Sequence, residues 1–295
     1  MKKNILILIL LTSYLVNAQQ LNKTVTDAKG KIMLLGKTNK QAFSNDELSW
    51  FKKYYNDYQT NSKVINQFKD SLNNYTIKAF YGSWCGDSKR GIPKFYKVLD
   101  EANFNMNKLE MVAVDRKPEA YKTSPNGEEK GLNIHRVPTF IFYKGKKEIG
   151  RIVEAPVQDF ERDINTITSL KRYSSKYLVV DYLHKLLKTQ SIEEIKTNEN
   201  QLISSLSEFT KGSRELNTYG YKLLRSKQPQ KALFIFNLNT KIYPYKYNVF
   251  DSLGEAYYTL KNYEESLKNY DIVLSLKPDD KNALEMIKKI KKEMI

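Results

Sequence analysis

The hydrophobic and polar positions divide the chain into an N-terminal apolar run, a stretch of short strands and helices, and a purely helical stretch. The apolar run, Ile5–Leu11, follows Lys2 and Lys3 and precedes the small residues that end at Ala18. This order is typical of a secretory signal peptide, and the run is too short for a bilayer span, which needs about 20 residues. We therefore expect residues 1–18 to be a signal peptide and the mature protein to be exported, periplasmic or extracellular. An uncleaved anchor is the alternative.

Residues 19–69 are expected to form an N-terminal extension that packs on the domain after it. Lys31–Leu35 is predicted as a short strand, and Ser44 and Glu47 have the spacing of a capping box, which predicts that a helix begins there. Aromatic residues then recur at every fourth position, so they would share one face of that helix. These are Trp50, Tyr54 and Tyr58. Such a stripe is typical of core packing.

Between residues 70 and 172 the pattern changes to alternating strands and helices. Short runs rich in β-branched and aromatic residues predict strands at 77–81, 109–115, 139–143 and 148–153. Amphipathic runs predict helices at 88–103 and 157–170, with a loop and a short helix at 118–131. This order predicts an α/β domain with a mixed sheet between helices.

Strand patterns stop after residue 172, and the rest of the chain is predicted to be helical. Residues 173–211 are expected to form a helical connector with two helices, at 176–188 and 192–209. Because two repeats seldom bury enough surface alone, this connector should cover one end of the helical domain that follows.

An internal repeat occupies residues 212–295. Gly220 and Gly254 are 34 residues apart, and so are the two prolines that end the units, Pro244 and Pro278. This period and pattern resemble the tetratricopeptide repeat, a helix-turn-helix unit. The resemblance implies an all-α domain of paired helices, with a C-terminal helix capping the stack.

Composition narrows the class of protein. A single cysteine excludes a disulfide-stapled scaffold, and 41% hydrophobic residues exclude wholesale disorder. The net charge of +16, from 49 Lys+Arg against 33 Asp+Glu, is spread along the chain apart from a lysine cluster at 288–292. Spread charge favours solvated lysine-rich faces, with an anionic partner such as nucleic acid or lipid as the alternative. With no motif attached to the charge, we expect no nucleic-acid partner, and no integral membrane span after signal removal.

The one cysteine falls at a chemically informative place. The segment Trp84-Cys85-Gly86 follows a buried-strand pattern and precedes a helix. At a helix N-terminus, free backbone N–H groups and the helix dipole stabilise a thiolate. Gly86 would let another backbone approach the sulfur closely. This position therefore favours a thiolate at Cys85.

These residues resemble the active-site region of the thioredoxin superfamily. Pro93 has the family spacing from Trp84, and Val137-Pro138 matches the cis-proline that opens a later strand in the family. The resemblance implies that Cys85 is the nucleophile, that Trp84 flanks it, and that Val137 and Pro138 form a platform on which a substrate peptide pairs. With its Gly-Asp-Ser sequence, the segment also resembles a group of exported bacterial thioredoxin-like proteins.

Three departures from the family pattern bear on mechanism. Ser88 stands where the family has its resolving cysteine, Asp87 where proline is common, and Ala79 where a buried acid is usual. The Ser88 hydroxyl could hydrogen-bond the thiolate, whereas the charge of Asp87 opposes one. Alternatively, both are simply favourable residues for the start of a helix.

Two functional hypotheses remain at this point. In the first, the protein is a monothiol oxidoreductase or isomerase for thiol–disulfide exchange, because one thiol can form a mixed disulfide but cannot resolve it. Its partners are then protein or peptide clients, held through mixed disulfides and the repeats. In the second, it is a redox-inactive binding or assembly factor that uses the same surfaces. No cofactor or metal is expected, since His135, His184 and Cys85 lack zinc-site spacing.

Overall fold

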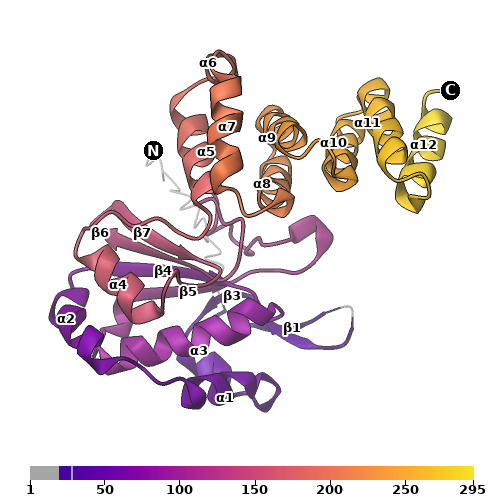
Figure 1. The fold of residues 1–295 in the computed structure, drawn as a ribbon. Coiled ribbons are helices and arrows are strands. Elements are labelled where there is room, and N and C mark those ends of the chain that lie inside the picture. Colours follow the sequence, from indigo (N-terminus) through magenta and orange to yellow (C-terminus); the bar gives the residue numbers. More distant parts are fainter. Residues whose placement is uncertain (1–19, 28) are drawn as a thin grey trace, which may run out of the picture.

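The computed structural model describes residues 20–27 and 29–295, so the predicted signal peptide lies outside the described residues. Figure 1 shows two parts: a sheet with helices packed against it, and a row of helices that extends away from the sheet. Within the described ranges, no helix is long and apolar enough to cross a membrane.

The five-stranded sheet has the order β3-β5-β4-β6-β7. Its strands are β3 (Gly36–Thr38), β4 (Thr76–Tyr81), β5 (Leu109–Ala113), β6 (Thr139–Lys144) and β7 (Lys147–Val153). β4 and β5 are parallel, and the other pairs are antiparallel. The mixed sheet predicted from the apolar runs is confirmed. The edge strand β3 comes from the N-terminal extension.

The two faces of the sheet are covered differently. Along β4, Ile77, Ala79 and Tyr81 belong to the larger core, together with side chains from four helices. These are α1 (Trp50–Asp57), α2 (Ser62–Leu72), α3 (Gly86–Glu101) and α4 (Phe160–Thr168). Phe80, on the opposite face, packs with Ile134 from the segment between β5 and β6. That segment holds only a short 3-10 turn, η4 (Pro118–Ala120), so a loop covers this face.

The N-terminal extension is built into the α/β part. β1 (Thr24–Thr26) and β2 (Ile32–Leu34) form a hairpin, and β3 then joins the main sheet. The backbone N–H of Leu34 donates to the Ser83 hydroxyl at 2.8 Å, which ties the hairpin to the loop that precedes Cys85.

The predicted start of the first helix is wrong. The Ser44 hydroxyl donates to the backbone of a preceding 3-10 turn instead of capping a helix. The Asn45 side chain caps a second 3-10 turn at the N–H of Glu47, and the α-helix begins only at Trp50. Asn and Ser both cap well, so the sequence alone did not decide between them.

The aromatic stripe also differs from its prediction. Trp50 and Tyr58 pack against the core, but Tyr54 is not part of that cluster. Phe51 is buried in its place, and its ring lies 5.9 Å from that of Tyr55. The inward face of α1 is therefore rotated by about one residue from the predicted face.

The second part contains eight helices among the described residues. They are α5 (Leu178–Thr189), α6 (Ile192–Lys196), α7 (Glu199–Phe209), α8 (Ser213–Arg225), α9 (Pro229–Ile242), α10 (Tyr247–Thr259), α11 (Tyr263–Leu276) and α12 (Lys281–Glu293). The single helix predicted over 192–209 is split at Thr197 and Asn198, two residues of low helix propensity.

The last five helices form two hairpins and a cap, which confirms the tetratricopeptide-like repeats. α8 pairs with α9, α10 pairs with α11, and α12 packs on α11. A Cβ at Gly220 would lie 2.6 Å from the Phe236 ring, and one at Gly254 would lie 3.1 Å from Tyr270. Glycine lets the helices of each hairpin approach closely. Ser266, where the repeat pattern has alanine, is buried and donates its hydroxyl hydrogen to the Gly254 carbonyl at 2.8 Å.

The two parts share a hydrophobic core. Val153 at the end of β7 belongs to the same buried cluster as Tyr177, Val180 and Leu216 of the helical part. α7 packs on α9 and α5 packs on α8, so the connector covers the first repeat as expected.

Candidate functional site

Cys85 lies at the junction of β4 and α3, where the sequence placed it. It is the N-cap of α3, with an extended backbone (φ −89°, ψ 130°), and its N–H donates to the Gly82 carbonyl at 2.8 Å. Its thiol is partly buried, and Sγ lies 3.5 Å from the carbonyl oxygen of Val137. The first N–H groups of α3 lack partners inside the helix, so this end of the helix favours negative charge on the sulfur.

Trp84 is fixed beside the cysteine by two contacts. Its Nε1–H donates to the Val114 carbonyl at 2.9 Å, and its ring centroid lies 5.4 Å from that of Tyr121. A Cβ at Gly82 would come within 2.6 Å of the indole. The absence of a side chain at Gly82 therefore allows Trp84 to lie against the turn.

Ser88 has a different role from the one predicted. Its side chain is fully buried, and its hydroxyl oxygen accepts the Gly82 N–H at 3.2 Å. In the described part of the chain no hydrogen bond joins Ser88 to Cys85. The hydroxyl therefore holds the turn between β4 and α3, and the predicted bond to the thiolate is wrong for this structure.

Asp87 points away into solvent with a partner of its own. Its carboxylate lies 2.5 Å from the Arg90 guanidinium, and the two side chains are 42% and 55% exposed. Of the two basic residues that follow Ser88, Lys89 and Arg90, it is Arg90 that pairs with Asp87. Asp87 is a favourable residue for the first turn of α3. It contributes little electric field at the Cys85 sulfur, because its charge is paired and solvated.

The approach of another backbone to the sulfur at Gly86 stays a prediction, whereas Gly91 makes a close packing contact within the chain. A Cβ at Gly86, which is exposed, would meet only the tip of Arg90 at 3.4 Å. A Cβ at Gly91 would lie 3.2 Å from the Pro138 ring. Gly91 thus lets α3 pack against the segment that faces Cys85.

The Val137–Pro138 peptide bond is cis, as the resemblance implied. Val137 is buried, and its carbonyl is the partner of the Cys85 thiol. The Pro138 carbonyl accepts the Glu154 N–H at 2.7 Å. Cys85, Trp84, Val137 and Pro138 are therefore brought together at one end of the sheet.

Three residues that the sequence did not single out complete these surroundings. Tyr121 packs on Trp84, Lys122 donates from Nζ to the His135 carbonyl at 2.7 Å, and the Arg225 guanidinium lies 5.2 Å from the Tyr121 ring. Burial raises the pKa of Tyr121, and the nearby Cys85 adds to this. Burial also lowers the pKa of Lys122 to about 8, with Arg136 contributing. No motif marks these residues, because they come from a loop and from a repeat helix.

Both histidines lie where the two parts of the molecule meet. His135 is buried, its ring packs edge-on against Tyr177 and Tyr219, and burial lowers its pKa to about 3. His184 Nδ1 lies 3.1 Å from the Tyr219 hydroxyl oxygen, and burial lowers the pKa of His184 to about 4. Both rings are therefore neutral at pH 7. No group of three His, Cys, Asp or Glu residues in the described chain could hold a metal ion.

Arg136 joins the site to the helical part. Its guanidinium pairs with Glu154 at 2.9 Å, lies 4.5 Å from the Tyr177 ring and reaches the Thr218 hydroxyl of α8 at 3.5 Å. Glu154 also accepts the Tyr177 hydroxyl. These contacts hold α8 against the loops around Cys85.

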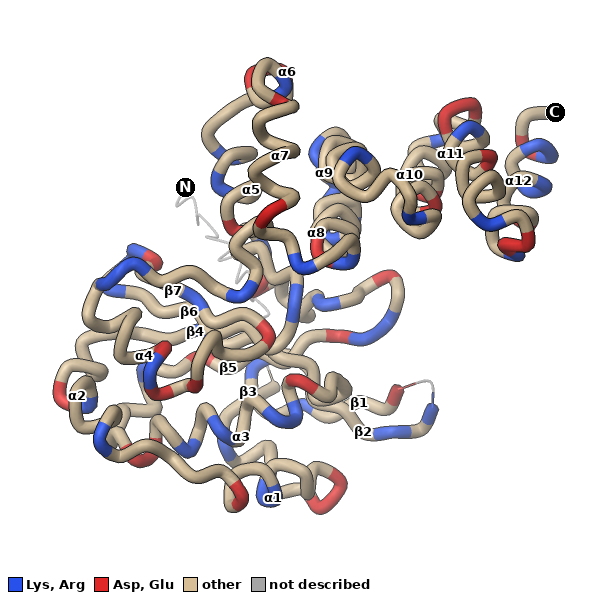
Figure 2. Tube along the Cα trace, in the orientation of Figure 1, with Lys and Arg blue, Asp and Glu red and all other residues tan. Residues whose placement is uncertain are grey.

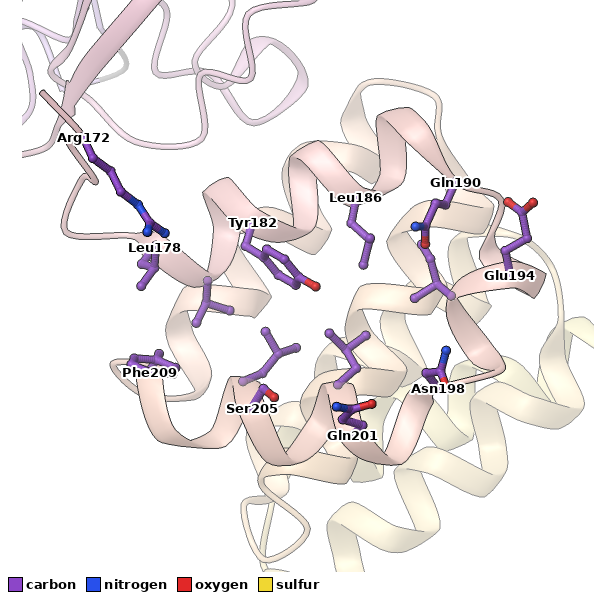
Figure 3. Close-up of a pocket in the computed structure, with 14 residues that line it drawn as sticks. Arg172, Leu178, Tyr182, Leu186, Gln190, Glu194, Asn198, Gln201, Ser205 and Phe209 are labelled. Atoms are coloured by element: carbon purple, nitrogen blue, oxygen red, sulfur yellow. The ribbon is translucent and has the colours of Figure 1, made fainter. Parts of the chain in front are cut away.

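A separate apolar groove lies between α5 and α7. Figure 3 shows Leu178, Tyr182 and Leu186 of α5 facing Ser205 and Phe209 of α7. The groove has a volume of about 570 Å³ and shares no lining residue with the surroundings of Cys85. It is therefore a feature of the helical part and contributes nothing to the chemistry of the thiol.

Comparison with known proteins agrees with this fold. Residues 59–166 match the thioredoxin family model, so the α/β part of the chain is a thioredoxin domain. The chain is 32% identical over 90 residues to Thioredoxin H2-1 of Oryza sativa subsp. japonica. The matched region covers 30% of this chain and 58% of that protein. It is 28% identical over 103 residues to Thioredoxin H2 of Arabidopsis thaliana, which covers 35% of this chain and 69% of that protein.

Solved structures were also found that are similar to the chain over 40% of its length. One is the NMR structure of the first TPR domain of the human RPAP3 protein, with 18% identity, a TM-score of 0.29 and 91% of that chain covered. Another is the first TPR of Spaghetti (RPAP3) bound to the HSP90 peptide SRMEEVD, with 20% identity, a TM-score of 0.29 and 93% covered.

Proposed function

We propose that this protein is an exported monothiol thiol–disulfide exchange protein with Cys85 as its nucleophile. The observation that carries the proposal is the partly exposed thiol at the start of α3, 3.5 Å from the carbonyl that precedes Pro138. The match to the thioredoxin family model supports the same chemistry. Export rests on the predicted signal peptide, and a mature N-terminus at Gln19 in the purified protein is the expected result of N-terminal sequencing.

The reaction has two exchange steps. The Cys85 thiol first loses its proton to solvent, and the thiolate attacks one sulfur of a client disulfide, forming a mixed disulfide while the other client sulfur leaves as a thiolate. A second thiol, from the client or from an external small-molecule thiol, then displaces Cys85. With a client thiol the client is isomerised, and with two external thiols it is reduced.

Ser88 limits this mechanism to a single thiol. Its hydroxyl holds the Gly82 N–H and cannot displace a bound client from Cys85. The mixed disulfide should therefore persist until another thiol arrives.

Intact-mass measurement of the purified protein tests the proposal. Incubation with a peptide disulfide should add the mass of one peptide half to the wild-type chain, and the Cys85→Ala variant should gain nothing. A Ser88→Cys variant should shed the adduct on its own and turn over disulfide with a dithiol reductant. A wild-type chain that forms no adduct would contradict the proposal.

Binding without redox chemistry is the second candidate function. The repeats and the apolar groove between α5 and α7 favour it, because both offer surface for a partner protein. If this function is the correct one, capture of a native partner is the same for Cys85→Ala as for the wild type.

A further inference from the structure

A cleft made of two adjoining hollows lies between the thioredoxin domain and the repeats. One hollow of about 190 Å³ lies between Tyr121 and His135 on one side and Tyr221 of α8 on the other. A second hollow of about 580 Å³ continues along α8 and the start of α9. The two hollows share Lys222 and Arg225, so they form one cleft.

The lining of this cleft is strongly basic. Seven Lys and Arg side chains line it, and they come from the loop between β5 and β6 and from the helical segments on the other side. The only carboxylate that lines it, among the described residues, is Glu129, which accepts hydrogen bonds from the Ser124 N–H and hydroxyl. The positive charge is therefore not neutralised within the cleft. Figure 2, by comparison, shows basic and acidic residues interspersed along most of the chain.

The cations nearest the thiol lack acidic partners. In the part of the chain that the structure describes, Lys122, Lys222 and Arg225 form no ion pair within 4.0 Å. Lys222 donates to the Ser226 hydroxyl at 3.0 Å, and Arg225 lies over the rings of Tyr121 and Tyr221 at 5.2 and 5.5 Å. Burial lowers the pKa of Lys222 as well as that of Lys122. A bound anion would offset the cost of burying these charges.

One buried polar atom in the cleft wall has no partner in the folded chain. His135 is 2% exposed, and its Nε2 makes no hydrogen bond, although its Nδ1 lies 3.3 Å from the Asn133 carbonyl. Because the Asn133 carbonyl can only accept, Nδ1 carries the proton and Nε2 of the neutral ring is an acceptor. Buried polar atoms normally find partners, so this orphaned acceptor in the lining of a cavity points to a donor on a ligand, such as a peptide N–H. His135 lines the smaller hollow, together with Tyr121 and Lys122.

The cleft and Cys85 are joined by a chain of contacts. Arg225 lies over Tyr121, Tyr121 packs on Trp84, and Trp84 precedes the nucleophile. The cleft is therefore separated from the thiol by Tyr121 and Trp84, and Cys85 is near enough to act on the pKa of both Tyr121 and Lys122. Nucleic acid and lipid carry no thiol or disulfide, whereas an acidic peptide can present both a carboxylate and a cysteine.

We propose that this cleft binds acidic segments of client peptides, with carboxylates on Lys122, Lys222 and Arg225, and so places a neighbouring client cysteine at Cys85. The inference rests on the proposed function, because it names the substrate class of the same thiol. The client is recognised by charge beside its cysteine rather than by the cysteine alone.

Binding to the full-length Cys85→Ser variant tests the inference without any redox step. The probe is a fluorescent peptide of alternating Glu and Ser, and a Gln-for-Glu peptide of equal length is its control. Arg225→Gln removes one charge-assisted contact, so its affinity for the acidic probe should fall by about tenfold and its affinity for the neutral probe should stay the same. Arg214→Gln, an exposed position on the same helix that does not line the cleft, should bind both probes as the parent does.

Each outcome supports or overturns the inference. Equal affinity for the two probes would overturn it, and so would an oligonucleotide that binds more tightly than the acidic peptide. Reactivity is measured separately, as the rate at which wild-type Cys85 attacks an anionic and a neutral aromatic disulfide. Fast attack on both without a charge preference removes the inference and leaves the proposed function in place. No attack on either removes the proposed function, while the binding measurement still decides the inference.

Discussion

At the scale of single residues, the turn before α3 is organised around small side chains. Gly82 leaves room for Trp84, Ser88 holds the Gly82 N–H, and Gly91 admits Pro138. The family motif predicted the position of Cys85 at the start of α3 and the cis Val137–Pro138 bond, and both are present. It did not predict the role of Ser88, because the hydrogen-bond partner of a buried hydroxyl depends on how the surrounding backbone folds.

Two glycines in the turn should differ sharply on substitution. Gly82→Ala must displace the Trp84 indole, which a Cβ would approach to 2.6 Å, and should destabilise the fold by about 1–3 kcal/mol. Gly86→Ala, at the exposed first turn of α3, should be neutral or slightly stabilising. Urea unfolding followed by tryptophan fluorescence measures both. Similar midpoints for the two variants would show that Trp84 is not held by the turn.

The Ser88→Ala variant distinguishes an effect on the stability of the fold from an effect on the reactivity of Cys85. The variant leaves the buried Gly82 N–H without its acceptor and should lose about 1–2 kcal/mol of unfolding free energy. Its alkylation rate at Cys85 should stay within about twofold of the wild type, because Ser88 does not contact the sulfur. Iodoacetamide kinetics at pH 7 provide the measurement, and a tenfold fall in rate would contradict the assigned role.

At the scale of helices and strands, the strands of the apolar runs and the short strand at 31–35, which is β2, were predicted, whereas the helix α2 and several short elements were not. The strands β4, β5, β6 and β7 fall within a few residues of their predicted bounds. The three-residue strand β3 and the 3-10 turns before α1 were missed, because so few residues show no periodicity. Their conformation depends on partners elsewhere in the chain, as in the pairing of β3 with β5.

The repeat hairpins provide a graded test. Gly220→Ala would bring a Cβ within 2.6 Å of Phe236, whereas Gly254→Ala would meet Tyr270 at 3.1 Å. Since alanine otherwise favours a helix by about 1 kcal/mol, Gly220→Ala should destabilise and Gly254→Ala should be closer to neutral. Thermal unfolding by circular dichroism ranks them. The reverse order would show that α8 and α9 are not packed as closely as described.

At the scale of the whole molecule, part of the positive charge is concentrated at one place. The sequence indicated solvated lysine-rich faces, and Figure 2 shows Lys and Arg spread along most of the chain. The exception is the cleft between the domains, where Lys122 of the thioredoxin loop meets Lys222 and Arg225 of α8. Sequence could not predict this meeting, because the residues belong to different domains and no local pattern sets how the domains pack.

The interface between the parts should weaken in acid. His135 has a pKa of about 3 when folded and 6.5 when unfolded, so between these values the unfolded chain binds more protons. The contribution of neutral His135 to the unfolding free energy is complete above pH 6.5 and is lost as the pH drops towards 3. At pH 5 the loss from this residue is about 2 kcal/mol. Arg136, Lys122 and Arg151 face the ring and oppose its protonation.

His135→Gln should remove that part of the pH dependence. The unfolding free energy of the variant, measured in urea at pH 7 and pH 5, should fall by about 2 kcal/mol less than that of the wild type. The test uses the difference between the two proteins, so other titrating groups cancel. Equal falls would mean that His135 does not stay neutral in the folded protein.

The central claim, that Cys85 forms mixed disulfides which the protein cannot resolve, is tested most directly by trapping. The protein is isolated from its own cells after rapid alkylation, without reductant, and resolved before and after reduction. The account predicts client proteins linked to the wild type, released by reductant and absent from Cys85→Ala. A wild-type chain recovered entirely as the alkylated free thiol, with no linked client, would contradict it.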